Sequence, residues 1–267
     1  MIKKIVLLQI VFLLINSCAT VPLTGRQQLS LVSNPEIIMM SSQQYQQVLT
    51  GSKLSGNREQ TQMIKRVGTR IKGAVEGYMA NAGLSSQLEG FQWEFNLIQN
   101  DSTVNAWCMP GGKVAFYTGI LPICKDENGV AVVMGHEVAH AIANHGRERM
   151  SQGLVENGLL GSLSAALGQN PTMTEQIFLQ AMGLGANIGM LKFSRGQESE
   201  ADHIGLIFLA MAGYDPHEAP KFWERMITKS TSAKPPEFLS THPSDQSRID
   251  ALNGWIPEAM QYYTKKK

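Results

Sequence analysis

One stretch decides the fold: residues 130–142, which read VAVVMGHEVAHAI. Its apolar character, interrupted by one carboxylate and two imidazoles, indicates a buried helix. His136 and His140 are four residues apart and lie on one face of that helix, where both imidazoles can bind one metal ion at about 2.0 to 2.1 Å. Glu137 lies about 100° further round the helix, so its carboxylate stands beside the metal, where a general base for a metal-bound water belongs.

A zinc ion with two histidine ligands needs a third protein ligand and an open position for water. His145 follows His140 by five residues without a glycine turn, so we expect it to be a helix-end residue that bonds carbonyl groups or faces water. Glu198 is the better ligand because it opens a second helix. Asp202 shares its face and can hold a ligand histidine by the other ring nitrogen, whereas Glu200 points elsewhere.

A further polar cluster lies nearer the C-terminus. Pro243 starts a helix on which Arg248 lies just over one turn later, so His242 and Arg248 can point into one cleft. Donors placed in this way can stabilise the oxyanion of a tetrahedral intermediate. Taken alone, a His-Pro step is more typical of a helix cap, and such an arginine is more typical of a surface ion pair.

Together these motifs resemble the zinc metallopeptidase family of HtpX, BepA and the CAAX prenyl proteases, gluzincins with H-E-x-x-H on one helix and E-x-x-x-D on a later one. The sequence is similar to the periplasmic lipoprotein branch, because it lacks the multiple membrane spans of the other branches. The matching stretches are Pro22-Leu23-Thr24-Gly25-Arg26, Asn105-Ala106-Trp107, Pro110-Gly111-Gly112-Lys113-Val114, Thr118-Gly119-Ile120-Leu121, His136 to His140, Glu198 to Asp202, and His242-Pro243 with Arg248.

The resemblance implies a zinc metalloendopeptidase with one Zn²⁺ per chain. The metal ligands would be His136, His140 and Glu198. Glu137 would act as general base and then as proton donor, and Asp202 would orient His136. His242 and Arg248 would stabilise the oxyanion.

The resemblance also implies how substrate binds. In this family the extended segment before the Pro-Gly-Gly turn borders the cleft, so Asn105, Ala106 and Trp107 would accept substrate as an added strand. Main-chain pairing favours extended chains, so the expected substrates are unfolded or misassembled envelope proteins, as in protein quality control. The alternative is a non-enzymatic assembly factor that binds its clients in the same way, but the presence of Glu137 favours hydrolysis.

The remaining pattern predicts an α+β fold, mostly α-helical, of the zincin-like metalloprotease kind. We expect a small antiparallel sheet bordering the active-site cleft, built from strands at 91–98, 104–108 and 113–117. Helices are expected from Asn34, as N-cap, to about Leu49, and from Arg58 to about Ala82. The metallopeptidase domain is expected to span residues 34–267.

The N-terminus reads as a lipoprotein signal. Lys3 and Lys4 precede a short apolar run that ends before Cys18, which predicts a signal peptide over residues 1–17 rather than a membrane span. The residues before Cys18 resemble a lipobox, and Ala19 favours the periplasmic face of the outer membrane. Residues 18–33 would then form a tether that holds the protein to the membrane by its lipid. The alternative is a plain secretory signal.

Composition excludes several classes of function. The 267 residues are 43% hydrophobic with a formal net charge of +1, so the chain can form a sizeable core and has no overall field for a polyanion. Without a local basic patch, we expect no nucleic-acid partner. The remaining cysteines, Cys108 and Cys124, form either a disulfide or two free thiols. No residue indicates an oligomeric state or a role for His203 and His217.

Two segments are candidates for a latch over the site. His242 can occupy the water position of the zinc, and the Gly-rich segment 153–189 precedes the third ligand. Ordinary helices packed on the core are the alternative for the second segment. Polar residues interrupt it too often for a transmembrane helix.

Overall fold

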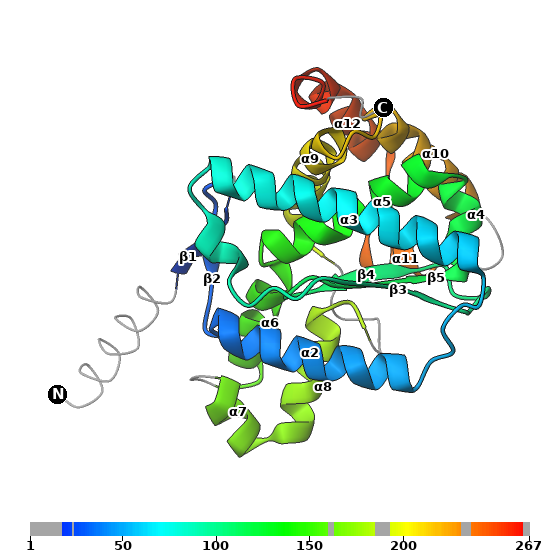
Figure 1. The fold of residues 1–267 in the computed structure, drawn as a ribbon. Helices are drawn as coiled ribbons and strands as arrows, with labels where there is room; N and C mark the ends of the chain where they lie inside the picture. The colour runs from blue at the N-terminus through cyan, green and yellow to red at the C-terminus, as the bar shows by residue number, and fades with distance from the viewer. Residues whose placement is uncertain (1–17, 23, 160–162, 185–192, 231–235, 264–267) are drawn as a thin grey trace.

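The computed structural model describes residues 18–22, 24–159, 163–184, 193–230 and 236–263 (Figure 1). The predicted signal peptide, residues 1–17, lies outside the described residues. The same holds for residues 160–162 and 185–189 of the candidate latch segment.

The described chain is mostly helical, with five short strands. The elements are β1 (Cys18–Thr20), β2 (Gln27–Leu29), α2 (Asn34–Thr50), α3 (Arg58–Asn81), η1 (Ser85–Leu88), β3 (Glu94–Ile98), β4 (Ala106–Met109), β5 (Lys113–Tyr117), η2 (Thr118–Ile120), α4 (Leu121–Cys124), α5 (Glu127–Ile142), α6 (His145–Glu156), α7 (Leu163–Gln169), α8 (Pro171–Ala181), α9 (Arg195–Met211), α10 (Glu218–Ser230), α11 (Phe238–Thr241) and α12 (Gln246–Ala259). This composition confirms the expected α+β class with a small sheet.

The central sheet has the order β3-β5-β4 and is mixed. β4 and β5 form the expected antiparallel pair, with Trp107 opposite Ala115. β3 instead runs parallel to β5, with Glu94 opposite Lys113. The chain reverses direction between β3 and β4 and again at the tight turn between β4 and β5, so β3 and β5 run the same way and are parallel as neighbours in the sheet. As a result, β4 is an edge strand of this sheet.

The sheet separates two hydrophobic cores. Val114 and Phe116 on β5 belong to the core that α3, α5, α9, α10 and α12 share, while Ala115 between them belongs to the core of α2, α6, α7 and α8. This alternation follows from the period of two along a strand. Figure 1 shows α3 and α2 on opposite faces of the sheet. The larger core surrounds α5, which places the predicted metal-binding helix at the centre of the molecule.

Local sequence determines where the first helices begin. α3 confirms the four-residue apolar period, with Val67, Ile71 and Val75 all buried. α2 takes Ser33 rather than Asn34 as its N-cap. Ser33 accepts a hydrogen bond from the Glu36 N–H, and the Glu36 carboxylate accepts one from the Ser33 N–H, which is a capping box.

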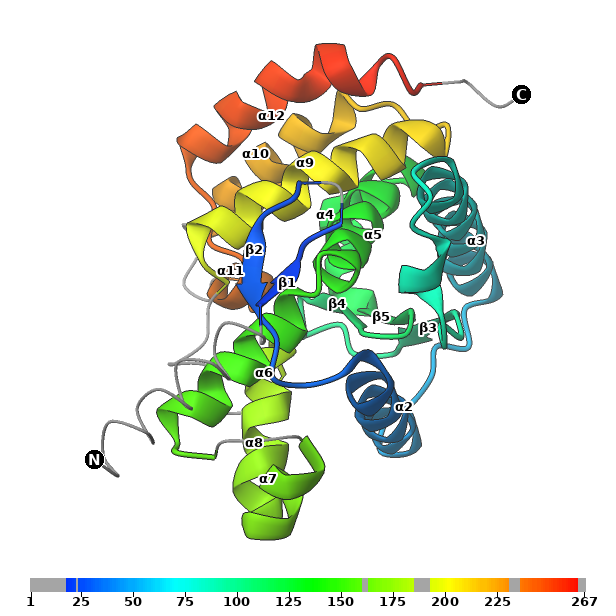
Figure 2. The same ribbon diagram turned by 90° about the vertical axis from the view of Figure 1, so that its left-hand side faces the viewer.

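The segment expected to be a tether folds back on the domain. β1 and β2 pair as an antiparallel hairpin with Thr20 opposite Gln27. The Leu31 N–H then donates to the Ser151 hydroxyl of α6, with an N···Oγ distance of 3.0 Å. Figure 2 shows the hairpin lying beside α5, α6 and α9. Among the described helices, none combines the length and the hydropathy that crossing a membrane requires.

Candidate metal centre

Helix α5 carries the H-E-x-x-H motif in a fully interior position. It begins at Asp126, whose carboxylate caps the N–H groups of Asn128 and Gly129. The helix is buried from Gly129 to Ile142, as its apolar sequence predicts. His136 and His140 are each only 3% exposed, so their imidazoles face other protein groups rather than water.

Helix α9 packs across α5 and supplies the carboxylates. It begins with a capping box between Ser194 and Gln197, directly before Glu198. The two helices approach most closely at Gly135 and Gly205, where a Cβ on Gly205 would lie 2.9 Å from the backbone nitrogen of His136. Only glycine fits a contact of this kind. The close crossing brings Glu198 against both histidines of α5.

Four side chains converge in the arrangement of a metal site. One potential ligand atom from each of His136, His140, Glu198 and His242 lies within 4.8 Å of all the others. The two Nε2 atoms of His136 and His140 are 3.1 Å apart, and His140 Nε2 is 3.3 Å from Glu198 Oε1. Nitrogen and oxygen ligands at about 2.0 to 2.1 Å in a tetrahedron are about 3.3 Å from one another. The spacing and the donor set therefore fit zinc.

Glu137 lies beside this cluster, as expected. It is buried, and its Oε1 makes no hydrogen bond to any described residue. The nearest described cation is His242, whose Nε2 is 3.4 Å from that oxygen. Burial raises the pKa of Glu137 to about 7, although the charge of His242 opposes the rise. A carboxyl group with such a pKa can both accept and return a proton near neutral pH.

Asp202 contacts the first histidine of the motif. Its Oδ1 is 2.9 Å from His136 Nδ1, which leaves His136 Nε2 for the metal. Arg248 holds Asp202 through two hydrogen bonds, of 2.5 Å from Nε and 2.8 Å from Nη2. The same guanidinium contacts Glu198 at 2.6 Å and stacks 3.5 Å over the ring of Trp223.

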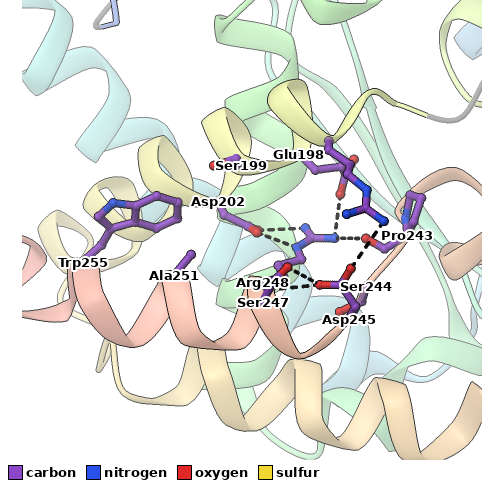
Figure 3. Close-up of a pocket in the computed structure, with 11 residues that line it drawn as sticks. Glu198, Ser199, Asp202, Pro243, Ser244, Asp245, Ser247, Arg248, Ala251 and Trp255 are labelled. Carbon is purple, nitrogen blue, oxygen red and sulfur yellow. Dashed lines mark hydrogen bonds and ion pairs between the residues drawn. The ribbon is translucent and has the colours of Figure 1, made fainter.

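The oxyanion role of Arg248 stays a prediction, and the structure shows contacts of its guanidinium to protein groups. Its Nη1 donates to the Pro243 carbonyl, 3.1 Å away, and its Nη2 is 3.3 Å from both ring nitrogens of His136. Figure 3 shows the guanidinium directed at Asp202, Glu198 and Pro243, along the wall of a pocket of about 450 Å³ that Trp255 also lines. Because its donors are all directed at protein groups, we assign Arg248 to positioning Asp202 and Glu198.

His242 reaches the cluster from the turn after α11. Its Nδ1 is 2.9 Å from Glu198 Oε1 and 3.2 Å from His136 Nε2. Burial acts to lower its pKa, but the carboxylates of Glu137 and Glu198 outweigh burial and raise the pKa of His242. The predicted proximity of His242 to the zinc ligands is thus present in the structure.

The expectation for His145 is wrong, whereas Glu200 points away from the metal ligands as expected. His145 is fully buried, with its Nδ1 2.8 Å from His140 Nδ1 and its Nε2 2.9 Å from Glu200 Oε2. Glu200 in turn accepts hydrogen bonds from Thr24 and Arg26. Burial acts to raise the pKa of Glu200, but the hydrogen bonds from His145, Thr24 and Arg26 outweigh it and lower the pKa to about 2. Sequence spacing excluded His145 as a ligand but carried no signal for a contact behind a ligand.

The proposed substrate strand borders the metal centre. The Tyr117 N–H donates to the Asn105 carbonyl, so Asn105 faces β5 with its peptide groups. Because this direction alternates along an antiparallel strand, the peptide groups of Ala106 and Cys108 point away from β5. The Cys108 N–H bonds the Glu137 carboxylate, which places the free edge of β4 next to the general base. Asn105, Ala106 and Trp107 are themselves buried.

Cys108 and Cys124 are free thiols in the structure. Of the two alternatives left by the sequence, the disulfide is therefore absent. Cys108 lies opposite Val114, and β5 continues for three residues past that level before η2 and α4 lead to Cys124. His203 pairs with Glu258 and His217 with Asp215, both away from the metal centre.

The chain is similar in sequence to several known proteins. The chain is 35% identical over 243 residues to the mitochondrial metalloendopeptidase OMA1 of Schizosaccharomyces pombe, which covers 90% of this chain and 66% of that protein. It is 29% identical over 245 residues to the beta-barrel assembly-enhancing protease of Escherichia coli, covering 89% and 47%. For the human mitochondrial metalloendopeptidase OMA1 the identity is 27% over 248 residues, covering 90% and 46%.

The chain thus spans less than two thirds of the length of each of these relatives. The model of peptidase family M48 matches residues 65–256. That range contains the H-E-x-x-H helix, the carboxylates of α9 and the C-terminal cluster of His242 and Arg248. The chain belongs to peptidase family M48.

Proposed function

We propose that this protein is a zinc-dependent endopeptidase that hydrolyses peptide bonds of unfolded or misassembled proteins. One observation carries the proposal: a buried carboxylate, Glu137, stands directly beside the cluster in which His136, His140 and Glu198 converge with His242. A purely structural zinc site is closed by four protein ligands and needs no such neighbour.

Bound zinc would supply a Lewis acid for the substrate carbonyl and lower the pKa of a water molecule to about 7. Glu137 accepts the proton of the attacking water at Oε1 and later returns it to the leaving amine. Its pKa of about 7 suits both transfers near neutral pH. Asp202 and Arg248 keep the ring of His136 and the carboxylate of Glu198 in place while the charge develops.

His242 is proposed as the oxyanion donor and as a latch. Its Nδ1 lies among the ligand atoms, which supports a state in which His242 takes the position of the catalytic water. Turning away from that position would leave the imidazole at the edge of the cleft, where its N–H can bond the oxyanion. We expect His242→Ala to lower the rate on a bound substrate and to raise exchange of a zinc-bound water. A loss of rate without any gain in exchange would show that His242 is purely catalytic.

Substrate is proposed to pair with the free edge of β4. The outward peptide groups of Ala106 and Cys108 are available on this side of the strand, and one of them already contacts Glu137. At the end of the same edge, the Phe238 N–H occupies the Val104 carbonyl with a 3.0 Å hydrogen bond. A substrate strand that extends this far must displace that bond. Asn105 and Trp107 flank the pairing residue and would set its position.

We further propose that the protein is held in the cell envelope by lipid on Cys18, at the periplasmic face of the outer membrane. The charged and apolar residues before Cys18 support this location. The Escherichia coli relative is named for enhancing beta-barrel assembly, which supports misassembled envelope proteins as substrates. Labelling with a fatty-acid analogue should mark the wild type and leave Cys18→Ser unmarked.

The decisive experiment compares wild type with Glu137→Gln. Both proteins are loaded with zinc, their metal content is measured, and each is incubated with an unfolded protein such as reduced casein. Glu137→Gln should keep its zinc and lose at least about two orders of magnitude in rate, because it lacks the general base. The exposed Glu156 on α6 provides the matched control, since Glu156→Gln removes the same charge away from the site.

A non-enzymatic assembly factor is the competing function. It predicts that wild type and Glu137→Gln bind unfolded protein equally and that neither cleaves it. Stoichiometric zinc with equal, background cleavage in the two proteins would therefore overturn the endopeptidase proposal.

A further inference from the structure

The N-terminal hairpin reaches the back of the metal centre. Arg26 follows Gly25, whose φ of +71° is in the left-handed region that favours glycine. This bend allows the side chains of Thr24 and Arg26 to bond the same carboxylate, Glu200. Arg26 Nε is 2.9 Å from Glu200 Oε2, and Thr24 donates its hydroxyl proton to Glu200 Oε1. A segment near the start of the chain thus holds a carboxylate of α9, which lies 174 residues later in the sequence.

From Glu200 a line of hydrogen bonds continues to a metal ligand. His145 lies between Glu200 and His140, with distances of 2.9 Å on the Nε2 side and 2.8 Å on the Nδ1 side. When His140 binds metal through Nε2, its proton is on Nδ1. His140 then donates to His145 Nδ1, and His145 donates its own Nε2 proton to Glu200. This assignment satisfies each nitrogen of the line with one partner and fixes both tautomers.

The guanidinium of Arg26 also holds a second carboxylate. Its Nη1 and Nη2 bond the two oxygens of Glu148 at 2.9 and 2.8 Å. Glu148 in turn accepts from the side-chain amide of Gln197 at 2.8 Å. Gln197 directly precedes the ligand Glu198, so Arg26 fixes the first turn of α9 by a second route.

We propose that Thr24 and Arg26 are positioning residues of the metal centre, which act through Glu200 and His145 on the ring of His140. The inference rests on the zinc site of the proposed function, but not on peptide hydrolysis. The other ligand histidine offers the precedent within the same molecule, because Asp202 holds His136 and is itself held by Arg248. Each ligand histidine is thus backed by a carboxylate, and each carboxylate is bonded by an arginine.

The burial along the line supports a role at the metal. His145 is 0% exposed and the Glu200 side chain 7%, while the Arg26 side chain is 36% exposed. A buried carboxylate that accepts an imidazole proton increases the basicity of the ligand beyond it. Partners of this kind are worth about 10- to 100-fold in metal affinity.

The test measures zinc affinity of the full chain by competition with a chelating dye. Arg26→Gln, and separately Glu200→Gln, should each weaken zinc binding by about 10-fold or more, as outer-shell changes do. Combining Thr24→Val with Glu200→Gln should add little to the effect of Glu200→Gln, because both substitutions interrupt one line at Glu200. Thr24→Val, which removes one hydrogen bond and no charge, should weaken binding less.

Glu258→Gln is the matched control. It breaks the 2.7 Å contact between Glu258 and His203. His203 lies on the same helix as Glu200 but does not contact a proposed zinc ligand. It should leave the zinc affinity at the wild-type value. Thermal unfolding of the zinc-free variants reports any merely structural effect.

If Arg26→Gln and Glu200→Gln lower the melting temperature of the zinc-free chain but bind zinc as tightly as wild type, the proposal is wrong and the hairpin only stabilises the fold. Additive effects in the double variant would equally exclude a single line. Weaker zinc binding by Arg26→Gln and Glu200→Gln would support this inference even if wild type and Glu137→Gln cleaved protein equally. Equal cleavage would overturn only the endopeptidase proposal. Should Glu200→Gln fail to fold, Thr24→Val and Arg26→Gln decide the outcome alone.

Discussion

Gly205→Ala should damage the metal centre without touching any of its ligands. The added Cβ would lie 2.9 Å from the carbonyl carbon of Gly135 and from the backbone nitrogen of His136. Ordinary van der Waals contacts of a Cβ begin at 3.4 Å. The atoms that the new Cβ would meet belong to the backbone, which cannot move aside by changing a side-chain rotamer. Helices α5 and α9 must therefore separate by about 0.5 Å.

That separation has two consequences of different size. Overpacking in a tight core lowers the free energy of unfolding by about 1 to 3 kcal/mol. The better helix propensity of alanine offsets up to about 1 kcal/mol of this loss. We expect a net loss of about 1 to 2 kcal/mol in the free energy of unfolding. Metal ligands tolerate displacements of about 0.2 Å, so a shift of about 0.5 Å of Glu198 from the α5 histidines should weaken zinc binding by at least about 10-fold.

Denaturant unfolding of the zinc-free chain and dye competition for zinc measure the two effects. Gly73→Ala is the control, because Gly73 is an exposed helical glycine of α3 and a Cβ added there would meet no described atom within 4 Å. Gly73→Ala should raise stability by about 0.5 to 1 kcal/mol and leave the zinc affinity unchanged. If Gly205→Ala matches this control in both measurements, the glycine contact does not set the spacing of the ligands.

Three further results are expected. Zinc at about 1,000 times its dissociation constant should stabilise the wild type by about 4 kcal/mol, measured as a higher melting temperature, and His136→Ala should abolish most of the gain. Burial acts to raise the pKa of Glu127, but Arg66 and Tyr214 outweigh it and lower the pKa. Its stabilisation is therefore present above the ordinary carboxyl pKa of about 4.5 and lost as the pH falls through the lowered pKa. Wild type and Glu127→Gln should differ in urea unfolding at pH 7, and the difference should shrink as the solution is made more acidic; a constant difference would contradict the ion pair. Burial also raises the pKa of the Cys124 thiol, so iodoacetamide at pH 8 should modify Cys124 only after unfolding, as mass spectrometry would show.

The sequence predicted which side chains share a face because their spacing is local. His136 and His140 are one helical turn apart, as are Glu198 and Asp202, and helix periodicity alone places each pair on one face. The start and end of β5 also agree with the expectation, since turn-forming residues such as Gly111 and Gly112 precede the strand. These features depend on residues within a few positions of one another.

What the sequence did not predict depends on contacts between distant segments. The parallel pairing of β3 with β5 has no local signature, because strand polarity in a sheet depends on the whole topology. The burial of His145 follows from its contact with Glu200 and from the hairpin that covers both. Nothing in the sequence around Gly135 and Gly205 shows that they meet. The contacts of Arg248 with Asp202 and Glu198 also join segments that are far apart in the sequence.

The two arginines show how the metal centre depends on the whole chain. All three proposed zinc ligands lie on α5 and α9, yet Arg26 comes from the hairpin before these helices and Arg248 from α12 after them. In Figure 2 the hairpin and α12 lie on different sides of α9. Each arginine bonds carboxylates that would otherwise be buried as unpaired charges, which is costly in a protein interior. The two helices can therefore bring the ligands together, but the geometry of the site is complete only when both flanking segments have folded against them.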